Sequence, residues 1–247
     1  MFPYRDENET QRTPFVTLAL IAGTSYVWLA VQGGGAALPL AESVCNLGLI
    51  PGELTGLLPS GSAFDLGDGL SCVTDPGRET SSVITSMFLH GSWMHLLGNM
   101  WFLWLFGNNI EDVMTRPRFI AFYLVCGMAA AMAQVWANPA SAVPMVGASG
   151  AISGVMGAYL VLFPRVRVWT MIPLGFFFYS MALPAWVMLI YWALLQLVGG
   201  LGDIGAEGGG VAFWAHVGGF VAGVVLIRFF ERAGRVSGGR WRPRRLR

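Results

Sequence analysis

Long apolar segments alternate with short polar ones along most of this chain. A helix that crosses a bilayer needs roughly 20 largely apolar residues, and six charge-poor segments stand out at about this scale. We expect membrane helices over residues 14–32, 83–109, 119–137, 148–163, 185–198 and 211–227. The fourth is short because Asn138-Pro139 and Pro144 interrupt the uncharged sequence before it. The pattern predicts an all-α fold, a polytopic membrane bundle of six helices.

Two apolar regions do not fit a straight span. Residues 168–202 are too many for one helix and include Pro173 and Pro184, so we interpret the part before residue 185 as a hydrophobic loop or a helix extension. In the loop 33–82, the apolar patches 47–50 and 54–58 predict short amphipathic helices in the membrane interface. The domain organisation we expect is given by three ranges: a cytoplasmic segment 1–13, a membrane domain 14–230 and an arginine-rich cytoplasmic tail 231–247.

Composition agrees with a lipid-facing surface. Of 247 residues, 55% are hydrophobic and only 12% are charged, whereas a soluble domain carries about 25% charged residues. The net charge of +1 gives no global attraction for nucleic acid, so we expect no nucleic-acid partner. The cysteines lack zinc-site spacing. Cys126 is expected in the core, and a Cys45–Cys72 disulfide is one possibility for the long loop.

The basic residues predict the orientation. If the N-terminus is cytoplasmic, the inner segments carry fourteen of the fifteen arginines and the outer loops carry only Arg78. A cleaved signal peptide at the first span is an alternative, but it would leave five spans and violate this asymmetry. We expect the arginine-rich tail to bind anionic lipid. Without a long soluble domain or a Ser/Arg-rich leader, the chain is expected in a bacterial inner membrane with both termini cytoplasmic.

Four polar residues fall inside predicted spans, where polar groups are costly and usually face the bundle interior or a water-filled cavity. His95 and Asn99 are four residues apart on the second span, so they share one helix face. Ser149 opens the fourth span and His216 lies near the start of the sixth. These three spans begin at the outer face in the predicted orientation, so all four side chains can meet in the outer half of the membrane.

The residues around Ser149 suit a nucleophile. It lies in Gly147-Ala148-Ser149-Gly150, where small neighbours leave the hydroxyl accessible and a helix N-terminus offers free N–H groups to an oxyanion. His216 would be the general base. Small residues also predict close contact between the two spans, on faces formed by Ser149, Ser153 and Gly157 and by Ala215, Gly219 and Gly223.

A resemblance rests on three segments, HGSWMHLLGN at 90–99, GASG at 147–150 and AHVGG at 215–219. In these residues and in their order on the second, fourth and sixth spans, the chain resembles the rhomboid intramembrane serine proteases over residues 15–230. The resemblance implies a Ser149–His216 dyad without a third acid and without metal or cofactor. It also implies an oxyanion held by the Ser149 N–H and the side chains of His95 and Asn99, with Gly147, Gly150 and His90 in support. The substrates it implies are transmembrane segments that enter laterally and are cut near small residues.

The chain departs from the family pattern twice. Ser81 and Ser82 occupy the positions where members often have Trp-Arg, so the anchoring of that loop differs. Ser153 stands four residues after the nucleophile, where some members have an aromatic residue that stacks on the catalytic histidine. Another group must therefore orient His216. His90 is five residues from His95 and off its helix face, which favours a loop-supporting role.

Other functions remain as alternatives. A catalytically silent relative would bind transmembrane helices without cutting them, and a transporter would use the buried histidines but needs a repeat and a polar path. The segment Gly200-Leu-Gly-Asp203-Ile-Gly205 matches a dinucleotide fingerprint but follows no strand. It also resembles an aspartyl intramembrane protease signature, which requires a second carboxylate. We expect Asp203 and Glu207 in an outer loop.

Overall fold

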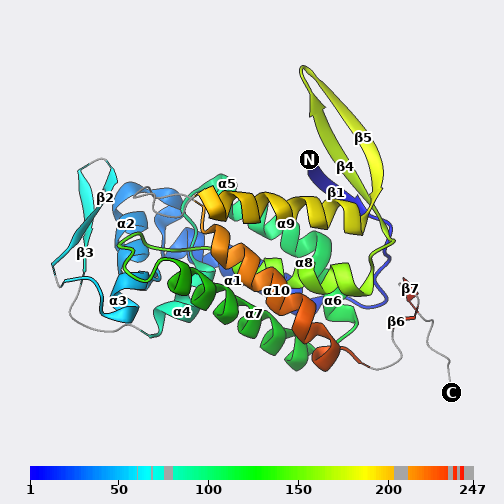
Figure 1. Cartoon of the computed structure of the whole chain (residues 1–247), viewed down its shortest axis with the longest axis horizontal. Coiled ribbons are helices and arrows are strands. Elements are labelled where there is room, and N and C mark those ends of the chain that lie inside the picture. Colours follow the sequence, from blue (N-terminus) through cyan, green and yellow to red (C-terminus); the bar gives the residue numbers. More distant parts are fainter. Residues whose placement is uncertain are drawn as a thin grey trace.

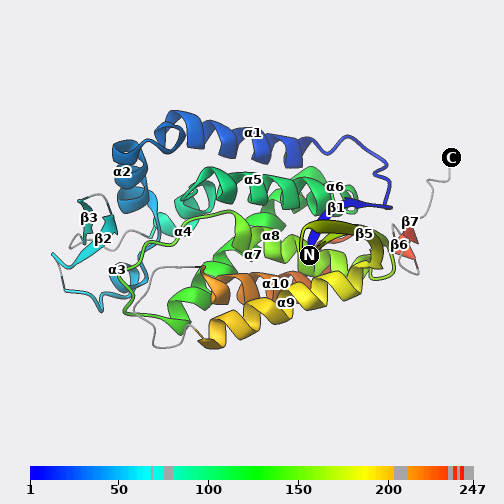
Figure 2. The same ribbon diagram turned by 90° about the horizontal axis from the view of Figure 1, so that it is seen from above.

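The computed structural model describes residues 1–59, 61–67, 69–74, 80–202, 211–232, 236–237 and 240–241. Its main helices run side by side along the long axis of the molecule (Figure 1), and the same packing is seen from above in Figure 2. The helices of this bundle are α1 (Phe15–Ala30), α5 (Trp93–Phe102), α6 (Asn108–Asp112), α7 (Arg116–Ala137), α8 (Ser149–Leu162), α9 (Ala185–Gly202) and α10 (Phe213–Phe230).

Three of these helices, α7, α9 and α10, are long and apolar enough to cross a membrane, and α1 and α8 are shorter apolar helices. Their bounds agree closely with the predicted first, third, fourth, fifth and sixth spans. A π-helical turn, η3 (Leu103–Gly107), joins α5 directly to α6, so residues 93–112 form one continuous helical segment.

The predicted second span begins later than its apolar pattern indicated. Residues 83–88 lie in two separate short turns, α4 (Ser82–Thr85) and η2 (Ser86–Phe88). Ser92 then starts α5 from an extended conformation, because its hydroxyl accepts a hydrogen bond from the N–H of His95 (3.1 Å). As a result, His95 and Asn99 lie in the first two turns of the helix, rather than three and four turns into it.

Helix α8 is the centre of the bundle, and every residue from Gly150 to Tyr159 is buried. It packs against α10 almost backbone to backbone. A Cβ on Gly219 would overlap the carbonyl oxygen of Gly150, and a Cβ on Gly223 would overlap that of Gly154. The predicted contact of the fourth and sixth spans is confirmed. Small residues allow this approach in lipid, where the hydrophobic effect does not draw helices together.

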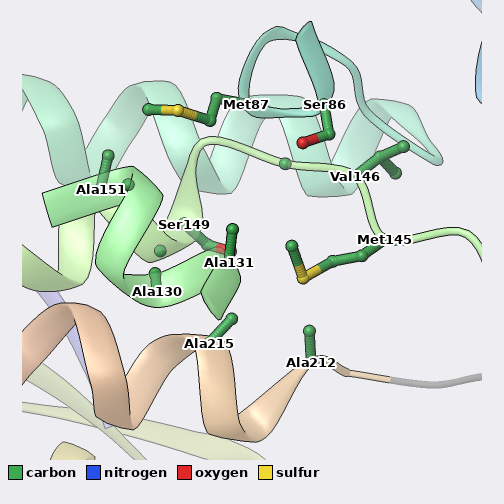
Figure 3. Close-up of a pocket in the computed structure, with 13 residues that line it drawn as sticks. Ser86, Met87, Ala130, Ala131, Met145, Val146, Ser149, Ala151, Ala212 and Ala215 are labelled. Carbon is green, nitrogen blue, oxygen red and sulfur yellow. The ribbon is translucent and has the colours of Figure 1, made fainter. Parts of the chain in front are cut away.

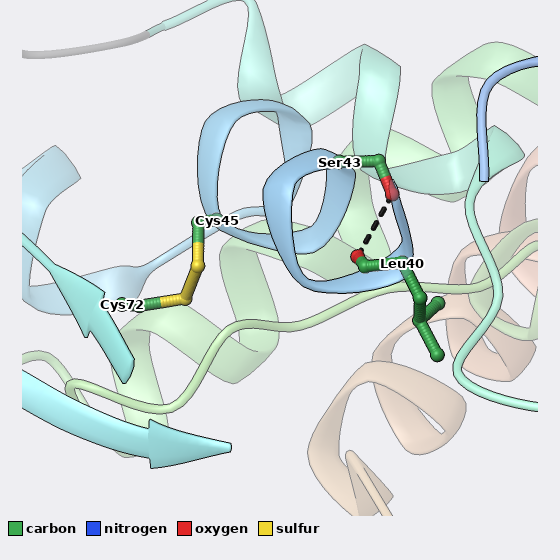
Figure 4. Close-up of a disulfide and its surroundings, with 4 residues drawn as sticks. All are labelled: Leu40, Ser43, Cys45 and Cys72. Atoms are coloured by element: carbon green, nitrogen blue, oxygen red, sulfur yellow. Dashed lines mark hydrogen bonds between the residues drawn. A yellow bond between two sulfur atoms is a disulfide. The ribbon is translucent and has the colours of Figure 1, made fainter. Parts of the chain in front are cut away.

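The long loop after α1 folds into small elements at one end of the bundle (Figure 1), and Figure 4 shows the disulfide within them. They are η1 (Gly33–Gly35), α2 (Ala37–Leu47), α3 (Pro51–Thr55) and the hairpin β2 (Ala63–Gly67) with β3 (Leu70–Val73). A disulfide between Cys45 and Cys72 links α2 to β3. Short helices were predicted in this loop at the patches 47–50 and 54–58, but the structure forms them at Ala37–Leu47 and Pro51–Thr55. Cys126 is buried as expected.

A three-stranded antiparallel sheet at the opposite end corrects the all-α prediction. Its strand order is β1-β4-β5, with β1 (Phe2–Asp6), β4 (Arg167–Leu174) and β5 (Phe177–Pro184). The segment interpreted as a hydrophobic loop or helix extension is therefore a β-hairpin. Its β-branched and aromatic residues favour strands, and Gly175 supplies the positive φ of 62° in the two-residue turn. Two further short strands are β6 (Val236–Ser237) and β7 (Arg240–Trp241).

Carboxylates at this same end fasten the N-terminal segment to the bundle. Glu111 accepts hydrogen bonds from the backbone N–H groups of Val16 (2.9 Å) and Thr17 (2.7 Å), which satisfies the start of α1. Asp6 accepts hydrogen bonds from Tyr159 (2.6 Å) and Asn109 (2.9 Å). Burial raises the pKa of Asp6 to about 6 in spite of these bonds. The predicted outer-loop positions of Arg78, Asp203 and Glu207 and most of the tail 231–247 lie outside the described residues.

Candidate active site

Ser149 and His216 are in direct contact. Nε2 of His216 lies 2.7 Å from Oγ of Ser149, a distance at which the hydroxyl donates to the imidazole. Ser149 is the first residue of α8 and His216 lies in the first turn of α10. The glycine contacts between these helices hold the two backbones close enough for this bond. Gln134 of α7 supports the start of α10 by accepting from the N–H of Ala215 (3.2 Å).

Gly147 determines the backbone conformation of the loop before α8. Its φ of 129° is rarely adopted by residues with a side chain. A Cβ at this position would also lie only 2.8 Å from Nε2 of His95. The same point is 3.6 Å from Oγ of Ser149, so the His95 ring and the Ser149 hydroxyl approach Gly147 from two sides. A glycine is thus required for both backbone conformation and space.

Asn99 carries an unused hydrogen-bond donor. The residue is buried, with 6% of its surface exposed, and within the described part of the chain its side-chain Nδ2 has no partner. Buried polar groups nearly always have one, so such an orphan requires an explanation. Asn99 lines a cavity of about 210 Å³ together with His95, Ser149 and His216. The four residues singled out from the sequence therefore surround one cavity.

That cavity lies between α5 and α9, because Met94, Gly98 and Phe102 of α5 and Trp192 of α9 also line it. A second, smaller cavity of about 20 Å³ adjoins Ser149 (Figure 3). Its walls are mainly small, with Ala130, Ala131, Ala212 and Ala215 around the serine. A space of this size accommodates about one water-sized group.

Helix α9 supplies two side chains to His216 that the sequence analysis did not identify. Nδ1 of His216 donates a hydrogen bond to Oε1 of Gln196 (2.7 Å). The Trp192 ring lies beside the imidazole, with 5.8 Å between the centroids. Gln196 is an amide in an otherwise apolar span, and a polar residue in such a position is by itself a reason to expect a functional contact.

His90 holds the loop that leads into α5. Gln32 exchanges two hydrogen bonds with the His90 backbone, accepting from its N–H (2.8 Å) and donating to its carbonyl oxygen (2.8 Å). The buried His90 ring packs edge-on against the His95 ring, with centroids 4.9 Å apart. His90 thus supports His95 and is not among the residues that line the cavity.

Ser153, one turn after the nucleophile, donates a hydrogen bond to the carbonyl oxygen of Ser149 (2.6 Å).

Comparison with known proteins gives a family match over the region that holds this site. The family model for the Rhomboid domain matches residues 77–232. Rhomboid protein 1, mitochondrial, of Saccharomyces cerevisiae is 28% identical over 156 residues, which cover 62% of this chain and 42% of that protein. Rhomboid-like protease 5 of Toxoplasma gondii is 33% identical over 153 residues, covering 60% of this chain and 16% of that protein.

A third relative is the human presenilin-associated rhomboid-like protein, mitochondrial, which is 32% identical over 90 residues, covering 36% of this chain and 24% of that protein. The chain matches less than half the length of each of these curated relatives. The family model, in contrast, covers more than half of this chain and includes all three segments that carried the resemblance. The chain is an integral membrane protein that belongs to the rhomboid family.

Proposed function

We propose that this protein is a serine endopeptidase that hydrolyses peptide bonds in or near transmembrane segments of other membrane proteins. The observation that carries this proposal is the 2.7 Å contact between Ser149 Oγ and His216 Nε2 beside a cavity. In the reaction, His216 removes the proton from Ser149 as the oxygen attacks the substrate carbonyl. It then donates that proton to the leaving amine, and a water molecule hydrolyses the acyl-enzyme by the same route.

The oxyanion of the tetrahedral intermediate would lie between the start of α8 and the second turn of α5. There the backbone N–H of Ser149 has no acceptor within its own helix. The side chains of Asn99 and His95 line the same space. The unpartnered Nδ2 of Asn99 supports this role, since a donor that waits for the intermediate stabilises the transition state more than the ground state.

The small cavity beside Ser149 supports a preference for small side chains next to the cut bond. Its alanine and glycine walls leave about 20 Å³, too little for a large side chain without movement of the helices. A six-span arrangement with residues 93–112 as the second span is part of this proposal. The compartment stays a prediction, because the relatives described above are eukaryotic, two of them mitochondrial, and do not support the expected bacterial inner membrane.

Gln196 takes the orienting role in this proposal. By accepting the Nδ1–H of His216, its amide oxygen keeps Nε2 unprotonated and directed at Ser149. The Trp192 ring lies beside the imidazole and takes the place of the aromatic residue that Ser153 replaces. Neither residue touches the reacting atoms, so both are positioning residues.

We expect Gln196→Leu to lower kcat about 10- to 100-fold with little change in KM, because loss of one hydrogen bond to a buried group costs on the order of 1–3 kcal/mol. Gln196→Glu retains the acceptor, and its carboxylate favours the charged imidazole. It should therefore restore much of kcat and move the acidic limb of the pH–rate profile to higher pH. The control is Leu195→Ala, on the exposed side of the same turn. Equal kcat values for Gln196→Leu and the parent would contradict the proposal that Gln196 orients His216.

The proposed activity is tested by labelling with a fluorophosphonate, which reacts covalently with activated serines. We expect the purified, membrane-reconstituted protein to be labelled, and Ser149→Ala and His216→Ala to be unlabelled. The matched control is Ser153→Ala, which removes the neighbouring hydroxyl of the same helix and should keep the label. Absence of labelling in the parent protein, together with stable capture of a transmembrane segment, would instead indicate a catalytically silent helix-binding protein.

A further inference from the structure

The hairpin formed by β4 and β5 ends in an exposed aromatic cluster. Phe176 is 100% exposed, Phe177 79%, Phe178 72% and Tyr179 57%. No described part of the chain covers these four side chains, which we call the hairpin tip. Contiguous apolar surface of this kind usually marks contact with a partner or a membrane. The proposed peptidase reaction does not use the hairpin tip.

The direction in which the hairpin leaves the bundle indicates its position relative to the membrane. It leaves the bundle where β5 runs directly into α9 at Pro184-Ala185. In Figure 1 the hairpin extends across the helix axes rather than along them. It is tilted so that its tip lies over the length of α9 and not beyond the end of the bundle. Helix α9 is long and apolar enough to span a membrane. A hairpin that leaves the end of a spanning helix in this direction is placed to reach the adjacent membrane surface.

The helix that follows the hairpin, α9, also carries large exposed apolar side chains. Trp186 (50% exposed), Ile190 (39%) and Leu194 (54%) lie one turn apart on that helix with large exposed apolar areas. Such side chains on a spanning helix face lipid. The hairpin tip and this face of α9 thus both present large apolar side chains to the surroundings of the bundle.

The charged residues at the base of the hairpin are also consistent with a position at the membrane interface. Arg165 and Arg167 are exposed at its start, and residues 167–184 contain no acidic residue. Two acids lie near the base: Asp6 is paired with Val168 in the sheet, and Glu7 accepts a hydrogen bond from the Trp169 indole (3.0 Å). Arginines at the headgroup level and aromatic rings slightly deeper are the usual arrangement of a membrane interface, and anionic lipid strengthens it.

Backbone hydrogen bonding limits how deeply the hairpin inserts. β5 is an edge strand, since the sheet order places β4 in the centre. Unpaired N–H and C=O groups of an edge are very costly in hydrocarbon. The hairpin is also held from the protein side by Tyr4, whose hydroxyl bonds Ser180 (2.6 Å), and by Pro3, whose carbonyl accepts from Trp101 (2.8 Å). A shallow position of the tip in the headgroup region satisfies both constraints.

We propose that the hairpin tip, Phe176–Tyr179, is an interfacial anchor that inserts into the cytoplasmic leaflet and prefers anionic lipid. The inference needs only the membrane location of the family and is independent of peptidase activity. In this proposal the lipid surface covers the hairpin tip. The alternative is that a second copy of the chain covers it, and the experiment distinguishes the two.

The test places an environment-sensitive fluorophore, nitrobenzoxadiazole, on Phe177→Cys in the full chain, reconstituted in phosphatidylcholine vesicles with or without phosphatidylglycerol. Of the native cysteines, Cys126 is buried and the other two are paired. The control is Glu9→Cys, an exposed position on the N-terminal segment beyond the end of β1. We expect blue-shifted emission at position 177, several-fold stronger quenching by headgroup-level lipid quenchers than by aqueous iodide, and the opposite order at position 9.

Anionic lipid should increase the blue shift at position 177, and the double variant Arg165→Gln/Arg167→Gln should remove that increase. Equal iodide quenching at positions 177 and 9 would overturn the proposal. So would a blue shift that disappears when the protein is diluted into excess lipid, because that result would identify a second copy of the chain as the occupant.

Discussion

Ser149→Ala is expected to reduce cleavage of a membrane-anchored reporter substrate on the order of a million-fold, the scale seen when a serine protease loses its nucleophile. His216→Ala should have a similar effect, because the Ser149 hydroxyl is a weak nucleophile without a base at 2.7 Å. The two residues act on one proton transfer. The double variant should therefore be no slower than either single variant.

The measurement is initial cleavage rate in detergent micelles and in proteoliposomes, with folding checked by thermal unfolding. Both single variants should unfold close to the parent temperature, since each removes one partly buried side chain and leaves the glycine contacts of α8 and α10 intact. Additive losses in the double variant would contradict a shared step. Residual cleavage by Ser149→Ala at more than about one-thousandth of the parent rate would contradict the assignment of the nucleophile.

Asn99→Ala should lower kcat about 100- to 1,000-fold with a small change in KM, the range for removal of one oxyanion donor. Because Nδ2 has no partner among the described residues, the substitution removes no hydrogen bond that this donor makes with them. We therefore expect the temperature of unfolding to stay near that of the parent. The combination of a large loss in kcat and unchanged stability distinguishes an oxyanion donor from a structural asparagine.

The matched control is Met94→Ala, which changes the wall of the same cavity without removing a donor. It should alter KM more than kcat. If Asn99→Ala were mainly destabilising, with turnover per folded molecule preserved, the residue would be a helix-packing group, and the oxyanion would have to be held by the Ser149 N–H and His95 alone.

Much of this architecture was predictable because membrane helices must be apolar and their buried polar residues are few. The helices α1, α7, α8, α9 and α10 lie close to their predicted bounds. His95, Asn99, Ser149 and His216 were predicted to meet on topology alone, and they do line one cavity. Spacing on one helix face and a shared depth in the membrane were sufficient for that inference.

Other features depend on information that hydropathy does not contain. The hairpin β4–β5 is largely apolar, and Pro173 and Pro184 indicated only that it does not continue a straight helix. Its β-branched residues and Gly175 are the features that favour a hairpin over an irregular loop. The start of α5 at Ser92 depends on a capping hydrogen bond. Gln196 was visible as a polar residue in an apolar span, but its partner is twenty positions away, and only the packing of α9 on α10 brings them together.

The link between Cys45 and Cys72 carries information about the surroundings of this protein. Such bonds persist where the compartment is oxidising and are rare where glutathione keeps thiols reduced. The end of the bundle that bears α2 and β3 is then expected to face away from a reducing cytosol. Thiol chemistry and the distribution of arginines, which have no physical connection, thus favour the same orientation of the chain in the membrane.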